Sequence, residues 1–145
     1  MNDDAKLIVE SIMSGDVHTV TAERTLGELK TIFEKVSYHH LLVENEGKLV
    51  GVISDRDVAR NLSPFLETSS ERRSDRSQLN ITAAELMATQ LITVGRESSI
   101  DFASILLLEN NISCLPVVRE NGQIEGIVSW KDILKYHVYG VEPQA

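Results

Sequence analysis

The sequence lacks several features that whole classes of protein require. A single cysteine, Cys114, stands within an apolar run. One thiol cannot form an internal disulfide, and we expect it to be a small buried residue of the core. No segment, including the acidic N-terminus, approaches the about 18 consecutive apolar residues of a membrane helix. The sequence therefore predicts a cytoplasmic protein without a membrane span.

Aromatic residues and positive charges are also scarce. Aromatic residues make up 5% of the chain, whereas 42% of the residues are hydrophobic, so the core must consist mainly of aliphatic side chains. The formal net charge is −8. A negative field repels phosphate backbones, which argues against general nucleic-acid binding. It does not exclude a small anion held by local donors.

Patterns that indicate catalysis or metal binding are missing as well. The four histidines, His18, His39, His40 and His137, form no HxxxH pair, and there is no cysteine cluster, so we expect no metal site. Ser54 has no recognisable paired base, and a Gly-x-Ser-x-Gly motif is absent, so we expect no enzymatic activity. His18 and His39 are better interpreted as rim residues of a binding site, where they could stack on a base or respond to pH.

The most informative feature is a repeat. The stretch GVISDRD, which begins at Gly51, returns as GIVSWKD at Gly126. A shift of 74 positions aligns many earlier residues, and one extra residue near Asn121 changes the shift to 75. The matched pairs include Met13 with Met87, Leu41 with Leu115, Ser54 with Ser129, Asp57 with Asp132, and Arg60 with Lys135. The chain is therefore an internal duplication.

Each copy predicts the order strand, helix, strand, strand, helix. The first helix follows Thr25, which forms a Ser/Thr-x-x-Glu capping box with Glu28, and Ser98 or Ser99 can cap its counterpart. The two later strands are joined by tight turns that contain glycine, and the last helix starts just after each repeated serine. A copy of about 50 residues buries too little surface to be secure alone, so the copies should pack together.

The repeat also sets the predicted boundaries. Residues 1–62 comprise a lead-in helix and the first copy, residues 63–80 a linker, and residues 81–145 the second copy. The lead-in helices are expected at residues 5–13 and 82–87. The linker is rich in Ser, Arg and Glu, and its Arg72, Arg73 and Arg76 could bind phosphate. A solvated charge run with a helical turn is the favoured interpretation.

Two interpretations fit the repeated Gly-x-x-Ser-x-x-Asp loop. Ser54 and Asp57 are spaced as the N-cap and N3 residues of a helix, and so are Ser129 and Asp132. The same arrangement also suits a nucleotide, because a serine hydroxyl can bind phosphate and a carboxylate can accept hydrogen bonds from both hydroxyls of a ribose. Arg56 would add a positive charge for the phosphate. Lys131 would do the same in the second copy.

The pattern resembles a tandem pair of CBS domains, the modules first described in cystathionine β-synthase. The resemblance covers residues 7–139 and rests on the element order, the strand Leu-Pro-Val-Val from Leu115, and the two loops. It implies an α/β (α+β) fold of two β-α-β-β-α repeats related by a pseudo-twofold axis, with two ligand clefts. It further implies that Ser54, Arg56 and Asp57 act with Leu91, Ile92, Ile112 and Ser113, and that Ser129, Lys131 and Asp132 act with Val17, His18, Tyr38 and His39.

Such modules often bind adenosine-type nucleotides (AMP, ADP or ATP), and sometimes S-adenosylmethionine or another nucleotide, and regulate a partner protein. The resemblance implies the same here, with a separate effector chain. The alternative is a nucleotide-free dimerisation or docking module. The first copy departs from the family in having Leu42 where the second has Pro116, so the two sites should differ. The family usually dimerises, and the run Ile105 to Leu108, which is apolar around the whole circumference of a helix, also predicts a homodimer.

Overall fold

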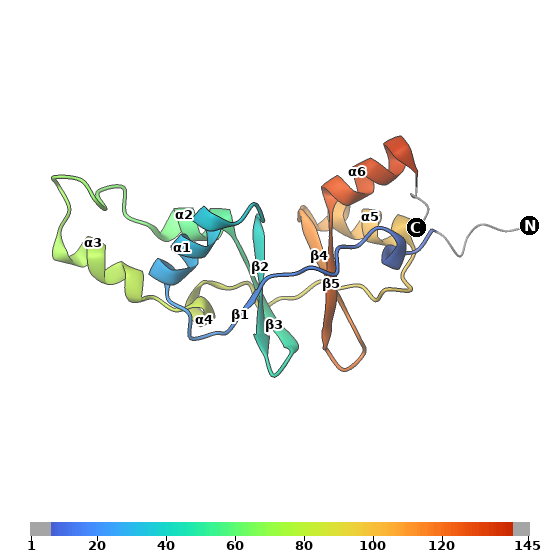
Figure 1. The fold of residues 1–145 in the computed structure, drawn as a ribbon, viewed down its shortest axis with the longest axis horizontal. Coiled ribbons are helices and arrows are strands. Elements are labelled where there is room, and N and C mark those ends of the chain that lie inside the picture. Colours follow the sequence, from blue (N-terminus) through green and yellow to red (C-terminus); the bar gives the residue numbers. More distant parts are fainter. Residues whose placement is uncertain (1–6, 141–145) are drawn as a thin grey trace, which may run out of the picture. The chain divides into compact units, whose positions relative to one another are not determined.

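The computed structural model describes residues 7–140, and the chain forms two compact units. The N-repeat unit consists of residues His18–Leu91, and the C-repeat unit combines the described residues 7–17 with residues 92–140. Figure 1 shows the order of the helices and strands in both units.

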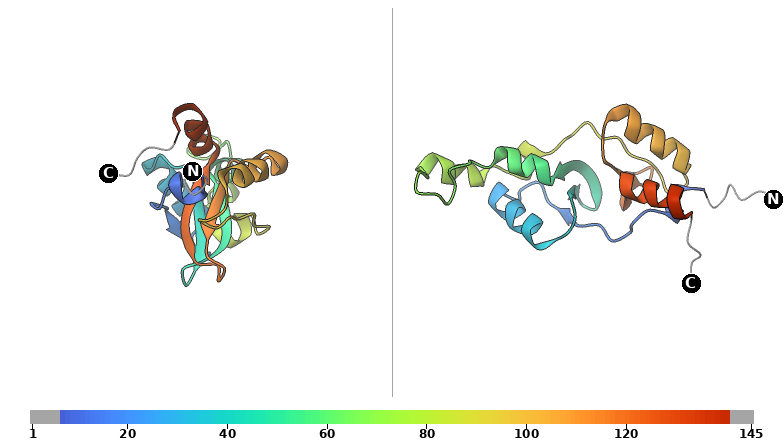
Figure 2. Two further views of the ribbon diagram at one scale, coloured as in Figure 1. Left: turned by 90° about the vertical axis from the view of Figure 1, so that its right-hand side faces the viewer. Right: turned by 90° about the horizontal axis from the view of Figure 1, so that it is seen from above.

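The N-repeat unit contains a three-stranded sheet in the order β1-β2-β3. Strand β1 (Thr19–Val20) runs parallel to β2 (His40–Asn45), which pairs antiparallel with β3 (Lys48–Ser54). Helices α1 (Leu26–Lys35) and α2 (Asp55–Asn61) pack together on this sheet (Figures 1 and 2). The core beneath them is aliphatic and includes Leu26, Leu29, Leu41, Val43 and Ile53.

The C-repeat unit repeats this plan with a smaller sheet. Strands β4 (Cys114–Val118) and β5 (Ile124–Ser129) form an antiparallel hairpin, and a single parallel bridge from Val94 to Val117 replaces β1. Helix α5 (Ile100–Asn110) packs against α6 (Trp130–Tyr139). The mixed helix and strand class and the duplicated element order are therefore confirmed.

The segments that precede the repeats are exchanged between the units. We call residues 7–17 the N lead-in and residues 81–91 the C lead-in. In the N lead-in, Ser14 exchanges two backbone hydrogen bonds of 2.9 Å with Ile127 on β5. In the C lead-in, Ala88 exchanges bonds of 2.9 and 3.2 Å with Val52 on β3. Each lead-in thus pairs with the outer edge of the other copy's hairpin, whose backbone groups would otherwise lack partners.

The beginning of each lead-in is fixed in the same way. Val9 donates to the carbonyl of Ser98 at 2.8 Å, and its counterpart Ala83 donates to the carbonyl of Arg24 at 2.7 Å. Val9 and Ala83 are both fully buried. The predicted boundaries follow the duplication, whereas the compact units follow these contacts, so each lead-in lies with the copy it does not precede.

Two glycines of the repeated motif allow this close approach. A Cβ atom on Gly51 would lie 2.3 Å from Sδ of Met87, in the C lead-in. A Cβ atom on Gly126 would lie 2.7 Å from the carbonyl oxygen of Ser14 and 3.0 Å from Sδ of Met13, in the N lead-in. The glycine that begins each Gly-x-x-Ser-x-x-Asp loop therefore has a packing role.

The predicted helix ends agree with the structure. Thr25 accepts from the backbone N–H of Glu28 at 3.2 Å, and the Glu28 carboxylate accepts from Thr25 N–H at 3.1 Å. Ser99 caps α5 by accepting from Phe102 N–H at 3.0 Å, whereas Ser98 accepts from the N–H of Gly95. Each later helix begins directly after its repeated serine, as expected.

The lead-in helices are shorter than predicted. Only a 3₁₀ turn, η2 (Val9–Ser11), forms within residues 7–13, and residues 5 and 6 lie outside the described part of the chain. Helix α4 (Ala83–Leu86) has four residues. Ser14 and Ala88, which directly follow the predicted helices, pair through their backbones, and this pairing requires an extended chain there.

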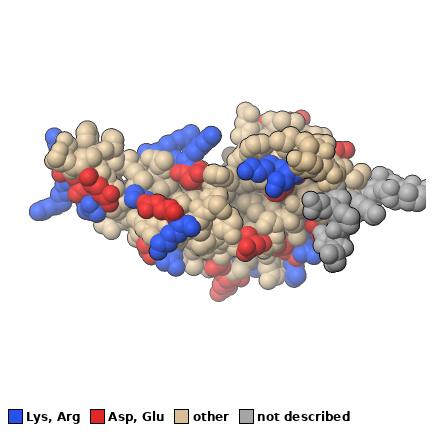
Figure 3. All heavy atoms as spheres, turned by 45° about the horizontal axis from the view of Figure 1, so that its top comes forward, with Lys and Arg blue, Asp and Glu red and all other residues tan. Residues whose placement is uncertain are grey.

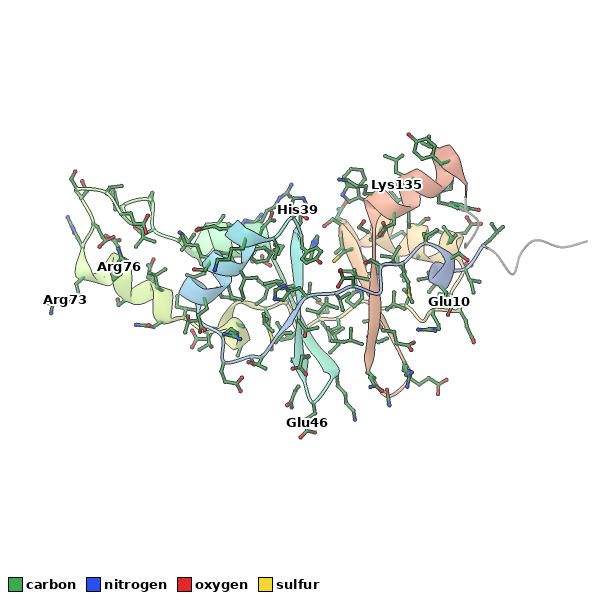
Figure 4. All side chains as sticks on the ribbon, viewed as in Figure 1. Glu10, His39, Glu46, Arg73, Arg76 and Lys135 are labelled. Carbon is green, nitrogen blue, oxygen red and sulfur yellow. The ribbon has the colours of Figure 1, made fainter. Side chains whose placement is uncertain are left out.

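The linker contains the expected helical turn. Helix α3 (Arg73–Ser77) is followed by the 3₁₀ turn η3 (Gln78–Asn80). Arg76, which Figure 4 labels with Arg73 on α3, pairs with Glu71 at 2.9 Å. Figure 3 shows basic and acidic side chains interspersed on the displayed face of the molecule. Within residues 7–140, no helix has the length and hydropathy needed to cross a membrane.

Candidate functional site

Each repeated loop forms a complete capping box. Asp57 donates its backbone N–H to Ser54 Oγ at 3.1 Å, and Ser54 donates its N–H to Asp57 Oδ2 at 2.9 Å. The second loop has the same two bonds, with Asp132 N–H to Ser129 Oγ at 3.3 Å and Ser129 N–H to Asp132 Oδ2 at 2.8 Å. The capping interpretation is therefore correct for both loops.

The capping box uses only one oxygen of each carboxylate. Both cap bonds go to Oδ2, and within residues 7–140 no hydrogen bond to Oδ1 of Asp57 or Asp132 is found. Both aspartates are half-buried. A carboxylate fixed through one oxygen can still accept hydrogen bonds at the other, so capping and ligand binding are compatible roles.

The first residue after each serine ties the loop to the segment before the hairpin. Asp55 donates its N–H to the carbonyl of His39 at 2.9 Å, and Trp130 donates its N–H to the carbonyl of Ser113 at 3.0 Å. His39 and Ser113 are equivalent positions of the duplication and belong to the residues expected to contact a base. The structure thus places one of these residues beside the loop of its own copy in both units.

A side-chain pair occurs beside the first loop that sequence reasoning did not identify. His39 Nδ1 lies 2.9 Å from Asp55 Oδ2. The His39 side chain is 72% exposed and that of Asp55 is 43% exposed, so the pair lies at the surface. The two residues are 16 positions apart, and no motif links them; only the hairpin brings them together.

Two predicted site residues of the first copy form a ring pair. The rings of His18 and Tyr38 meet edge to face, with their centroids 6.3 Å apart. Tyr38 is 40% exposed, and the carbonyl of His18 accepts from Leu42 N–H at 3.2 Å. Exposed rings of this kind offer a planar surface on which a base can stack.

In the second copy, the positions equivalent to His18 and Tyr38 are the aliphatic residues Ile92 and Ile112. Ile92 and Ile112 pack against the core of the C-repeat unit, and Val17 is the last residue of the N lead-in within that unit. Leu91 is the last residue of the N-repeat unit. The residues that the resemblance assigns to one ligand are divided between the two units, so their grouping stays a prediction.

The basic residues of the loops are exposed. Arg56 and Lys131 are both on the surface, and no salt bridge involving either is found among the described residues. Lys135, labelled in Figure 4 on α6, and its counterpart Arg60 are also exposed. Long basic side chains in this position are able to reach an anionic group that binds at the loop.

Burial changes the titration of two residues, His40 and Cys114. Burial lowers the pKa of His40 below its usual value, partly offset by the negative charge of Asp55. Burial raises the pKa of the Cys114 thiol to about 12, which disfavours a thiolate, and Cys114 is a core residue as predicted. Within residues 7–140, no three His, Cys, Asp or Glu side chains are grouped so as to hold a metal ion.

Comparison with known proteins identifies the two repeats. The family model described as CBS domain matches residues 9–64 and 83–139, one match for each copy. The chain belongs to the CBS domain family. Both matches contain a Gly-x-x-Ser-x-x-Asp loop, and together they leave out most of the linker.

Similar proteins include short and long chains. A CBS domain-containing protein of Dictyostelium discoideum is 30% identical over 95% of this chain and 96% of its own length. Homoserine O-acetyltransferase of Methanococcus vannielii is 32% identical over 87% of this chain, but the chain spans only 24% of that enzyme. CBS pairs therefore occur both in chains of this size and as parts of larger proteins.

A solved structure gives the fold with a ligand. The CBS domain pair of protein MJ0100, crystallised in complex with 5′-methylthioadenosine and S-adenosyl-L-methionine, is 29% identical. The match has a TM-score of 0.75 and covers 90% of this chain and 95% of that chain. A CBS domain pair similar to this chain thus binds two adenosyl compounds.

Proposed function

We propose that this CBS pair is a regulatory module that binds adenosine-type nucleotides and modulates a separate partner protein. The observation that carries the proposal is the pair of capping boxes, each of which holds a half-buried aspartate through Oδ2 and leaves Oδ1 without a protein partner among the described residues. Asp57 and Asp132 would accept the hydroxyls of a ribose, and Ser54 and Ser129 would donate to a phosphate. The adenosyl ligands of the MJ0100 pair support the ligand class.

The remaining assignments follow the family. Arg56 and Lys131 would meet the phosphate groups of AMP, ADP or ATP. The base would contact the predicted backbone segments around Tyr38 and Ser113. The module itself would perform no chemistry and need no cofactor, and its location in the cytoplasm stays a prediction.

Calorimetric titration of Asp57→Ala and Asp132→Ala with AMP and ATP tests the ribose role. A hydrogen bond to a charged acceptor contributes about 1.5–3 kcal/mol, so each variant should lose roughly 10- to 150-fold in affinity at its own site. Loss of the cap alone costs about 1 kcal/mol of stability. Glu28→Ala is the matched control, because it removes the capping box of α1, which is part of neither repeated loop. Wild-type affinity in both aspartate variants would reject the proposal.

A double variant tests the predicted grouping of residues. If Ser113 contacts the same ligand as Asp57, then Ser113→Trp should block the binding that Asp57→Ala weakens, and Asp57→Ala should add little in the double variant. If Ser113→Trp instead removes the binding that Asp132→Ala removes, each site is built within one repeat.

We also propose that the protein is a homodimer that associates through the C-repeat unit. Three side chains of α5 are half-exposed or more: Phe102 (49%), Ile105 (50%) and Leu108 (78%). Three side chains of the adjacent α6 are exposed as well: Trp130 (53%), Leu134 (51%) and Val138 (62%). We call these six residues the apolar helix face. A face of this kind commonly marks a protein–protein contact.

The first copy does not share this face. The positions equivalent to Phe102, Ile105 and Leu108 are Glu28, Thr31 and Glu34. Sedimentation of Ile105→Glu and of its matched control Thr31→Glu should therefore give a monomer for the first and a dimer for the second. A wild-type protein that sediments only as a 16.1 kDa monomer at tens of micromolar would contradict the proposal.

A further inference from the structure

The two repeated loops have nearly the same backbone. The cap bonds agree within 0.2 Å, since they measure 3.1 and 2.9 Å in the first loop and 3.3 and 2.8 Å in the second. The bond from the residue after the serine is 2.9 Å long at Asp55 and 3.0 Å long at Trp130. Any difference in ligand preference that arises at the loops must therefore come from their side chains.

The side chains differ by one negative charge. The first loop, Ser-Asp-Arg-Asp from Ser54, carries two carboxylates and one guanidinium, whereas the second, Ser-Trp-Lys-Asp from Ser129, carries one carboxylate and one ammonium. The next basic residues, Arg60 and Lys135, match. The difference in formal charge between the loops therefore comes from one position, which is Asp55 in the first loop and Trp130 in the second.

The extra carboxylate is fixed near the proposed ligand position. Asp55 stands between Ser54 and Asp57 in sequence, and its Oδ2 is held by His39, whose carbonyl also accepts the Asp55 N–H. At 43% exposure, it is only partly screened by water. A carboxylate near a bound phosphate lowers the affinity for the phosphate, while a tryptophan with 53% exposure adds an uncharged planar surface.

We propose that the two loops select ligands by charge. The Ser129 loop prefers adenosine compounds that carry phosphate, whereas the Ser54 loop binds phosphate more weakly and prefers adenosyl compounds that are neutral or positively charged at the 5′ position. The selecting residues are Asp55 and Trp130. The inference rests on the proposed function, because it assumes that both loops hold an adenosine-type ligand.

Other charged groups lie around Asp55 and must be accounted for. Arg56, Asp57, His39 and His40 all belong to this surface, and each of the first three interacts electrostatically with His40. Arg56 has the counterpart Lys131 in the second loop, so it does not distinguish the loops. The pairing with His39 offers a different role for Asp55, in which it only holds the imidazole against a base.

Titration with adenosine and AMP separates these possibilities, because the two ligands differ only by the phosphate. Each loop is studied alone, the Ser54 loop in Asp132→Ala and the Ser129 loop in Asp57→Ala, by calorimetry at low salt. The ratio of AMP affinity to adenosine affinity should be higher at the Ser129 loop. In the respective backgrounds, Asp55→Asn should raise AMP affinity about 3- to 10-fold, and Trp130→Asp should lower it by a similar factor. Adenosine affinity should change little at Asp55→Asn.

Two controls make the outcome decisive. At about 1 M salt the screening length falls to about 3 Å, so the effect of Asp55→Asn on AMP should shrink. His39→Ala shows what the imidazole contributes without removing the carboxylate. If each of the variants Asp55→Asn and His39→Ala changes the affinities for adenosine and for AMP by the same factor, Asp55 only positions the His39 imidazole. Selection by charge is then wrong. Binding by both loops with the same AMP to adenosine ratio also overturns the inference, whereas no binding of either ligand in wild type overturns the proposed function itself.

Discussion

The substitution Gly126→Ala is expected to disrupt the contact between the N lead-in and β5. The new Cβ atom would lie 2.7 Å from the carbonyl oxygen of Ser14, and real Cβ atoms essentially never come that close to another heavy atom. The backbone of Ser14 also exchanges two hydrogen bonds of 2.9 Å with the backbone of Ile127, and one of them uses the same carbonyl oxygen. Relief of the clash therefore requires movement of a hydrogen-bonded backbone, not of a flexible side chain.

The magnitude follows from these two contributions. Overpacking of a well-packed site costs about 1–3 kcal/mol. Weakening one backbone hydrogen bond of the bridge adds about 1 kcal/mol. We therefore expect Gly126→Ala to lower the free energy of unfolding by about 2–4 kcal/mol, as measured by urea denaturation followed by circular dichroism.

Gly95→Ala is the matched control. A Cβ atom at Gly95 would meet its nearest neighbour, the carbonyl oxygen of Val118, at 3.9 Å, which is an ordinary contact. Gly95→Ala should therefore remain within about 0.5 kcal/mol of wild type. If Gly126→Ala is as stable as Gly95→Ala, the close approach of the N lead-in does not exist as described.

The equivalent glycine gives a second check, because its obstruction has a different nature. A Cβ atom at Gly51 would clash with side-chain atoms of Met87: Sδ at 2.3 Å, Cγ at 2.7 Å and Cβ at 2.9 Å. Truncation in Met87→Ala removes the two nearest atoms, so it should partly rescue Gly51→Ala. Met13→Ala should not rescue Gly126→Ala, because the carbonyl of Ser14 remains. Equal rescue in both pairs would refute the distinction between side-chain and backbone clashes.

Three further measurements follow from individual residues. Cys114, with a pKa raised to about 12 by burial, should resist alkylation by iodoacetamide at pH 8 in the native protein and react in urea; rapid native labelling would contradict its burial. Because folding lowers the pKa of His40 below 6.5, the unfolded chain binds a proton more readily, so stability should fall as the pH drops below about 6.5, and His40→Gln should flatten this dependence. Ser99→Ala should lower the free energy of unfolding by about 1 kcal/mol through loss of the α5 cap, seen as a lower midpoint in urea, and an unchanged midpoint would show that the cap contributes nothing.

Local structure could be predicted well from the sequence because its causes are local. The capping box at Thr25 and Glu28 depends on a four-residue spacing, and both helices that follow Ser54 and Ser129 start where the spacing predicts. The hairpin turn at Gly47 has a positive φ of 82°, which glycine adopts without strain. Each of these features involves residues within one turn of each other.

The contacts that were missed join residues far apart in the chain. The duplication aligned Met13 with Met87, yet no periodicity indicates that each methionine lies against the glycine of the other copy. The pair of His39 and Asp55 was missed for the same reason. In the site, the capping role and the proposed ribose role demand the same residues at the same spacing, so the pattern alone could not separate them. The structure shows that the cap uses Oδ2 of each carboxylate, which leaves the ribose role a prediction.

The exchanged lead-ins give the chain the connectivity of a domain-swapped dimer. Residues 7–17 complete the copy that follows the linker, and residues 81–91 complete the copy before it. Two identical single-copy chains could build the same two units if each lent its lead-in to the other. Residues 63–80 would then act as a covalent tether that turns an encounter between two molecules into one within a single molecule. Such a tether replaces dependence on protein concentration by a fixed effective concentration that the length and stiffness of the linker determine. A single polypeptide is also free to let its two copies diverge, as a symmetric pair of identical chains is not, and the charges of the two loops and the faces of α1 and α5 have diverged.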